Sequence, residues 1–156
     1  MSVAVILDTG PLSLIAGSGR TSKQESRECN NWLQSLLAQS IKVYIPEVCD
    51  YEARRSFIRI KSRNSLTRLD NIQGILNYLS ITTNAMREAA QFWADARNAG
   101  IPAASDNALD GDMVLIGQAA EVVPLVDRVI IATTNVKHIE RYHEAMLWQN
   151  IDAATL

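Results

Sequence analysis

The stretch VAVILDTGP, residues 3–11, decides how the rest of the chain is interpreted. Its first five residues are all apolar, which is typical of a strand buried inside a parallel sheet. Gly10 and Pro11 then force a turn into a short helix, which we predict over residues 11–16. Because sites in open α/β sheets lie outside the carboxyl ends of the strands, Asp8 is a candidate ligand or catalyst.

Strand and helix patterns alternate along the remainder of the chain. Further strands are expected at residues 42–45, 79–82 and 129–134, and residues 17–22 and 103–110 are expected to be loops. Helices are expected at residues 23–39, 47–61, 66–78, 84–98, 111–121 and 136–142. The buried face of the 84–98 helix is expected to consist of Met86, Ala89, Ala90, Trp93 and Ala96. This alternation predicts one three-layer α/β/α domain, residues 1–156, with a mainly parallel central sheet.

Composition narrows the class of protein. Apolar residues make up 47% of the chain and the net charge is −2, so a generally basic nucleic-acid-binding protein is excluded and phosphate contacts would need a local patch. The two cysteines, Cys29 and Cys49, lack the spacing of a zinc site and are expected to be reduced thiols. Without a signal peptide or a membrane-length apolar run, the chain is expected to be cytoplasmic, with no membrane partner.

Polar side chains gather at one predicted edge of the sheet. Asp8 follows the first strand, Glu52 lies in the helix after the second strand, and Asn135 follows the last strong strand. Asp110 and Asp112 stand where the 111–121 helix is expected to begin. Clustered carboxylates repel one another unless protons or cations neutralise them, and hard oxygen ligands suit Mg²⁺ or Mn²⁺. A metal site is the simplest interpretation of this set.

Each of these residues also has an ordinary structural interpretation. Asp8 could cap the helix that follows it, and Asp110 is more readily a cap of a helix beginning at Gly111 than a catalyst. Asp112 could favour the positive end of the helix dipole, Glu52 could be an exposed helical carboxylate, and Asn135 could be a turn residue. The two histidines, His138 and His143, lack zinc spacing and are expected at the surface or in packing contacts.

Four segments together resemble the PIN-domain nucleases, particularly the VapC-type toxins of bacterial toxin-antitoxin pairs. They are LDT (7–9), PEVCDYEARR (46–55), LDGDMVLIGQA (109–119) and ATTNVKHI (132–139), and the resemblance extends from the first strand to Trp148. It implies a PIN-like fold with Asp8, Glu52 and Asp112 as ligands of Mg²⁺ or Mn²⁺. The fourth catalytic position of the family, often Asp, falls on Asn135. Asn keeps an oxygen ligand but no charge, and Asp110 is a candidate to compensate as a metal ligand.

The resemblance implies a divalent-metal-dependent endoribonuclease, the toxin of a toxin-antitoxin module. Asp8 and Asp112 would hold a metal ion that activates water, and Glu52 would complete the coordination or accept the water's proton. The implied partners are an RNA substrate, a cognate antitoxin and a second copy of the chain in a homodimer. The alternative is a non-catalytic PIN-fold module that binds RNA or protein, and the missing charge at Asn135 keeps that alternative open.

A run of cations directly after Glu52 gives a candidate substrate surface. Between Ala53 and Leu69 there is no acidic residue, and the cations are Arg54, Arg55, Arg59, Lys61, Arg63 and Arg68. A carboxylate site needs such cations if it is to accept a phosphate backbone. We predict that Arg54, Arg55 and Arg59 bind substrate together with Thr9, whose hydroxyl could instead orient Asp8. The cations could also form a solvated helix face or an antitoxin-binding surface.

Overall fold

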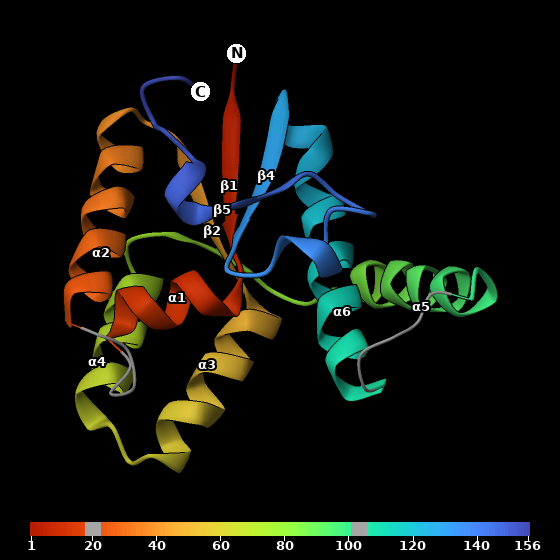
Figure 1. Cartoon of the computed structure of the whole chain (residues 1–156), viewed down its shortest axis with the longest axis horizontal. Coiled ribbons are helices and arrows are strands. Elements are labelled where there is room, and N and C mark those ends of the chain that lie inside the picture. The colour runs from red at the N-terminus through yellow and green to blue at the C-terminus, as the bar shows by residue number, and fades with distance from the viewer. Residues whose placement is uncertain (18–22, 101–105) are drawn as a thin grey trace.

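A computed structural model describes residues 1–17, 23–100 and 106–156 of the chain, with the backbone alone at 106–110. Its strands form one parallel sheet in the order β3-β2-β1-β4-β5 (Figure 1). The strands are β1 (Val3–Leu7), β2 (Lys42–Pro46), β3 (Asn77–Leu79), β4 (Arg128–Thr133) and β5 (Ala145–Leu147). β1 is the central strand and every one of its residues is buried, which confirms the strand predicted from the opening apolar run.

Helices flank the sheet on both sides, as the alternating pattern predicts. They are α1 (Thr9–Ala16), α2 (Lys23–Ala38), α3 (Glu47–Arg59), α4 (Arg63–Gln73), α5 (Thr83–Asn98) and α6 (Asp106–Val122), with short 3₁₀ turns η1 (Val123–Leu125), η2 (Val136–His138) and η3 (Trp148–Asn150). Figure 1 shows α2 on one side of β1 and α6 on the other side of β4. The α/β fold with a parallel sheet is therefore confirmed. None of the helices among the described residues has the length and apolar character to cross a membrane.

The register of the sheet brings several chain segments to one edge. Leu7 at the end of β1 lies beside Ala132 of β4, and Ile6 lies beside Tyr44 of β2. Because the strands are parallel, the residues that follow β1, β2 and β4 all emerge at this carboxyl edge. α1 and α3 start there, directly after β1 and β2 (Figure 1).

Two expected elements between residues 66 and 82 are shifted. α4 runs over Arg63–Gln73, where a helix over 66–78 was expected, and β3 occupies Asn77–Leu79, where a strand over 79–82 was expected. Gly74 ends the helix, and its backbone N–H donates to the Asn71 carbonyl. The following residues then pair with β2, with Tyr78 beside Ile45. The apolar stripe of the helix thus continues into a strand, a change that helical periodicity alone does not show.

The loop expected at 103–110 is wrong in its second half. α6 already begins at Asp106, so Asp110 is not the cap of a helix that starts at Gly111. Residues 18–22 and 103–105 of the two expected loops lie outside the described residues. Towards the C-terminus, the expected helix over 136–142 is only the 3₁₀ turn η2, and the edge strand β5 was not expected. β5 has only three residues, too few for an alternating pattern to indicate a strand.

The buried face of α5 also differs from the expected one. Ala89 and Ala96 are buried as expected, but Ala90 is exposed, and Met86 and Trp93 keep 47% and 38% of their surface exposed. The reason is a close approach between α5 and α6: a Cβ on Gly117 of α6 would collide with the backbone of Ala85. Small residues therefore face α6, and the larger apolar side chains of α5 turn outward.

Candidate active site

Asp8 is held rigidly at the carboxyl edge of the sheet. It is the N-cap of α1, and the backbone N–H of Thr9 donates to Asp8 Oδ1 over 2.7 Å. The Thr133 hydroxyl at the end of β4 donates to the other oxygen, Oδ2, over 2.7 Å. The Cys49 thiol of α3 lies 3.8 Å from Oδ1. The capping role expected for Asp8 is therefore present, and three neighbouring segments fix the direction of its carboxylate.

Glu52 approaches Asp8 from α3. The hydroxyl of Thr9 was a candidate to orient Asp8, but it donates to Glu52 Oε1 over 3.3 Å, and only the backbone N–H of Thr9 donates to Asp8. Burial raises the pKa of Glu52 and the neighbouring Asp8 carboxylate raises it further, while the Thr9 hydroxyl and the charge of Arg55 act in the opposite direction. The charged form of Glu52 is therefore less favourable than that of an exposed glutamate.

Asp112 reaches the same region from the first half of α6. A Cβ on Gly111, the preceding residue, would lie 3.3 Å from Glu52 Oε1, so glycine lets α6 pass close to that carboxylate. Burial raises the pKa of Asp112 to about 6; the charges of Asp8 and Glu52 also raise it, and that of His138 lowers it. The charge of Asp8 thus acts on both Glu52 and Asp112, so three acids far apart in sequence meet at one edge of the sheet.

The two remaining predicted ligands are Asn135 and Asp110. Asn135 is exposed and caps η2 without a side-chain hydrogen bond, and its backbone N–H donates to the Thr133 hydroxyl over 3.0 Å. The side chain of Asp110 lies outside the described residues. Whether either residue acts as a ligand stays a prediction.

The oxygen donors of these acids suit a divalent cation, whereas their spacing alone does not enclose one. Within the described part of the chain, no three His, Cys, Asp or Glu side chains are close enough together to hold a metal ion between them. Mg²⁺, however, keeps several water ligands and is commonly bound by only one or two carboxylates. The upward pKa shifts of Glu52 and Asp112 come first from burial and then from repulsion between carboxylates, and a bound cation would relieve that repulsion. The residues present therefore fit a cation held mainly by Asp8 and Asp112.

The cations of the predicted substrate surface occupy different environments. Arg54 forms ion pairs with Asp50, at 3.1 Å, and with Asp70, at 2.9 Å, so its guanidinium is already committed. Arg55 lies 3.8 Å from Glu52 Oε2 and remains largely exposed. Arg59 is exposed and forms no ion pair with any residue that the structure describes. Of the three predicted arginines, Arg55 and Arg59 are thus available to a substrate in this conformation.

Sequence reasoning missed three residues that shape the site. Thr133 and Cys49 both contact Asp8, and burial raises the pKa of the Cys49 thiol well above its usual range, which keeps it protonated. His138 was expected at the surface or in packing, and it is exposed, but its charge also lowers the pKa of Asp112. Thr133 and His138 lie close to Asn135 in the sequence, at and after the end of a buried strand. This position is the sequence signal that could have identified them as site residues.

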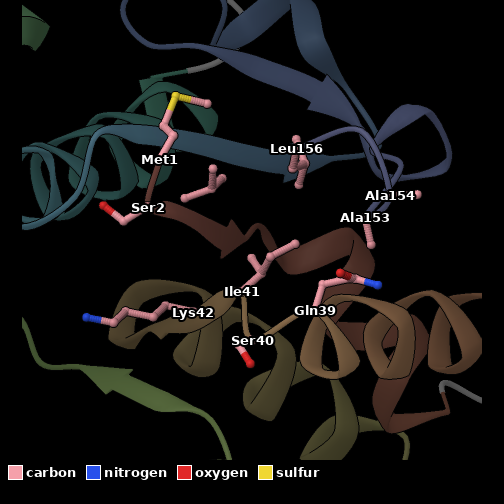
Figure 2. A pocket seen from close by; sticks show the side chains of 10 residues that line it. Met1, Ser2, Gln39, Ser40, Ile41, Lys42, Ala153, Ala154 and Leu156 are labelled. Atoms are coloured by element: carbon pink, nitrogen blue, oxygen red, sulfur yellow. The ribbon is translucent and has the colours of Figure 1, made fainter.

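A pocket at the opposite end of the sheet lacks this chemistry. It lies where β1 and β2 begin and where the chain ends, between residues such as Ser2, Ile41 and Ala153 (Figure 2). The described residues that line it include no acidic side chain, histidine or cysteine. The candidate active site is therefore the carboxyl edge of the sheet.

Comparison with known proteins shows a likeness in structure alone. The sequence matches no protein-family model and no curated protein. The fold matches a chain of VapBC2 from Rickettsia felis, crystallised with a DNA fragment from its promoter, at a TM-score of 0.69 and 14% identity, covering 92% of this chain and 97% of that one. The chain has a PIN-like fold. That fold also matches FitAcB from Neisseria gonorrhoeae (TM-score 0.68, 16% identity, 94% of this chain and 99% of that one).

A third match supports the same PIN-like fold. It is VapBC-1 from nontypeable Haemophilus influenzae, at a TM-score of 0.65 and 14% identity, covering 94% of this chain and 99% of that one. The VapBC and FitAcB structures are toxin-antitoxin complexes. Because each match covers nearly the whole of both chains, the resemblance to VapC-type proteins that the sequence indicates is confirmed at the level of the fold.

Proposed function

We propose that this chain is a divalent-metal-dependent endoribonuclease and the toxin of a toxin-antitoxin pair. The observation that carries the proposal is that burial and neighbouring carboxylates raise the pKa of Glu52 and of Asp112, which meet Asp8 at one edge of the sheet from separate segments. Perturbed carboxylates at the carboxyl edge of a parallel sheet are typical of functional sites. The PIN-like fold, shared with chains of toxin-antitoxin complexes, supports the choice of phosphodiester chemistry and of a protein partner.

Each residue of the site has a role in this proposal. Asp8, fixed by Thr133 and Thr9, and Asp112 would hold Mg²⁺ or Mn²⁺. The ion, when bound, supplies a water of lowered pKa and polarises the phosphate. Glu52 would accept the proton of the attacking water, because its raised pKa makes it a stronger base than an exposed glutamate. Arg55 and Arg59 would contact phosphate groups of the RNA, with Asn135 and Thr9 beside the scissile bond.

Cleavage of RNA by the purified, antitoxin-free protein tests the nuclease proposal directly. Total RNA should be cut in the presence of Mg²⁺ or Mn²⁺ and left intact in the presence of a chelator. Asp112→Asn should lose cleavage, whereas Glu140→Gln should retain it, since this exposed acid is not among the groups that shift the pKa of Glu52 or Asp112. Cleavage that persists in Asp112→Asn or in chelator contradicts the proposed mechanism.

The proposed antitoxin and the proposed homodimer need separate tests. A small protein encoded beside this one should co-purify with the chain and suppress its cleavage of RNA. Light scattering on the free chain should give the mass of two copies. A nuclease that stays active with every neighbouring gene product present would remove the toxin-antitoxin part of the proposal and leave the nuclease part intact.

The second candidate function is a non-catalytic PIN-fold module that binds RNA or protein. Two observations favour it: Asn135 supplies no charge, and the described residues hold no group of three closely spaced ligands. Such a module should bind its partner equally well with Asp8→Asn or Asp112→Asn. Loss of binding or cleavage in those variants, with the fold retained, decides for the nuclease.

A further inference from the structure

An exposed aromatic ring stands on α3 directly beside Glu52. Tyr51 keeps 59% of its surface exposed, although it lies in the middle of a described helix at the candidate site. The guanidinium of Arg55 lies over this ring, 5.1 Å from its centroid. The same guanidinium lies 3.8 Å from Glu52 Oε2. One side chain therefore connects the ring to the carboxylate proposed as the base.

Further cations follow this ring along the chain. Arg59, Lys61 and Arg63 follow it at the end of α3 and the start of α4, and all three are exposed. None of them is paired with an acid in the part of the chain that the structure describes. An exposed ring on a helix that continues into unpaired cations resembles the sites that track a single nucleic-acid strand, with bases on the ring and phosphates on the cations.

We propose that Tyr51 is a stacking platform for one nucleobase of single-stranded RNA, next to the scissile phosphate. Because Arg55 covers one face of the ring, the base stacks on the other face, and its phosphate lies towards Arg55 and Arg59. This inference rests on the proposed nuclease function, since it places the base by its distance from Glu52. A protein partner could also use an exposed Tyr–Arg pair, but the run of cations without acids between Ala53 and Leu69 favours a polyanion.

Another helix offers a matched control for this stacking pair. On α5, Trp93 is exposed and the guanidinium of Arg97 lies 5.0 Å from its ring centroid, which is the same local arrangement. Its neighbours include Met86 and Ala90, and the surface there is mainly apolar. A general effect of removing an exposed aromatic residue should appear equally at Trp93, whereas a specific platform should be sensitive only at Tyr51.

Binding of a fluorescent single-stranded RNA of random sequence, measured by anisotropy in chelator so that no cleavage occurs, tests the proposal. Tyr51→Ala should weaken binding by roughly tenfold, since one base–aromatic stack is worth that much or more. Tyr51→Phe should bind like the wild type, and so should Trp93→Ala. A 2-aminopurine base in the RNA should be quenched by the wild type and by Tyr51→Phe, and much less by Tyr51→Ala. Melting temperatures of the variants check that the fold is retained.

Three outcomes overturn the inference. Tyr51→Ala could bind RNA as tightly as the wild type, or Trp93→Ala could weaken binding equally. Tyr51→Ala could also leave RNA binding unchanged while lowering the mass found by light scattering, which would make this face an interface between protein chains. If the wild type binds RNA through Tyr51 but cuts no RNA in Mn²⁺, the nuclease proposal fails and the stacking platform stands. If it cuts RNA and Tyr51→Ala binds and cuts normally, only the platform fails.

Discussion

Replacement of Asp112 by Asn should stabilise the metal-free protein at neutral pH, although it removes a proposed ligand. The folded chain raises the pKa of Asp112 from 3.8 to about 6, through burial and the charges of Asp8 and Glu52. Between these two values the folded state binds more protons than the unfolded state. Stability therefore falls as pH rises through this window, and the full cost is present above about pH 6. The neutral amide of the Asp112→Asn variant would escape this cost.

The size of the effect follows from the shift in pKa. A rise from 3.8 to about 6 corresponds to about 3 kcal/mol if the group is fully shielded from water. Asp112 is only partly buried, so solvent screening reduces the expected gain to about 1 kcal/mol. For a domain of this size, that gain raises the melting temperature by roughly 2–4 °C.

Thermal melting in chelator at a series of pH values measures this effect. Asp112→Asn should melt above the wild type near pH 7, and the two curves should converge near pH 4, where the unfolded carboxyl also takes up its proton. Glu140→Gln should follow the wild type throughout. Addition of Mn²⁺ should reverse the order, because the wild type gains binding energy and the variant gains little. A metal-free Asp112→Asn protein that melts below the wild type near pH 7 would show that the three acids do not repel one another.

Two further predictions concern the framework of the site. Thr133→Val removes the hydroxyl that donates to Asp8 Oδ2 and should weaken Mn²⁺ binding, measured by calorimetry, roughly 10–100-fold. Thr133→Ser should restore the affinity. Equal affinity in the Val variant would show that the hydroxyl does not position Asp8. Gly117→Ala places a methyl group against the backbone of Ala85 and should lower the free energy of unfolding in urea by about 1–3 kcal/mol. An unchanged urea midpoint would mean that α5 and α6 do not pack this closely.

The sequence predicts an element when the pattern that indicates it lies within that element, and it fails when the element depends on contacts with another. The buried run of β1 and the two helices that follow β1 and β2 are visible because apolar periodicity and Pro or Gly punctuation coincide there. β5 is not visible, since a three-residue edge strand takes its identity from pairing with β4. The outward turn of Trp93 depends on the close approach at Gly117, a contact between helices that no periodicity within α5 records.

In the candidate site, too, some residues can be predicted from local sequence signals and others cannot. Asp8, Glu52 and Asp112 can be predicted from sequence because carboxylates at strand ends and early helix positions have few reasons to converge without a cation. Their supports are harder to predict. Cys49 is three residues from Glu52, and nothing in its neighbourhood indicates that the thiol would turn towards Asp8. Arg54 was expected to bind substrate with Arg55, but the two side chains leave α3 in different directions, and Arg54 meets Asp50 and Asp70.

The hydrogen bonds at this edge of the sheet indicate that the three acids differ in how firmly they are positioned. Asp8 receives a hydrogen bond on each carboxylate oxygen, from Thr9 and Thr133, so its direction is set before any ion arrives. Glu52 has one long hydrogen bond, from Thr9, and Asp112 is placed by α6. A preorganised ligand costs little entropy on binding, whereas the other two acids gain by relief of repulsion. Removal of the supports of Asp8 should therefore lower affinity for the cation, while neutralisation of Asp112 should change affinity and metal-free stability in opposite directions.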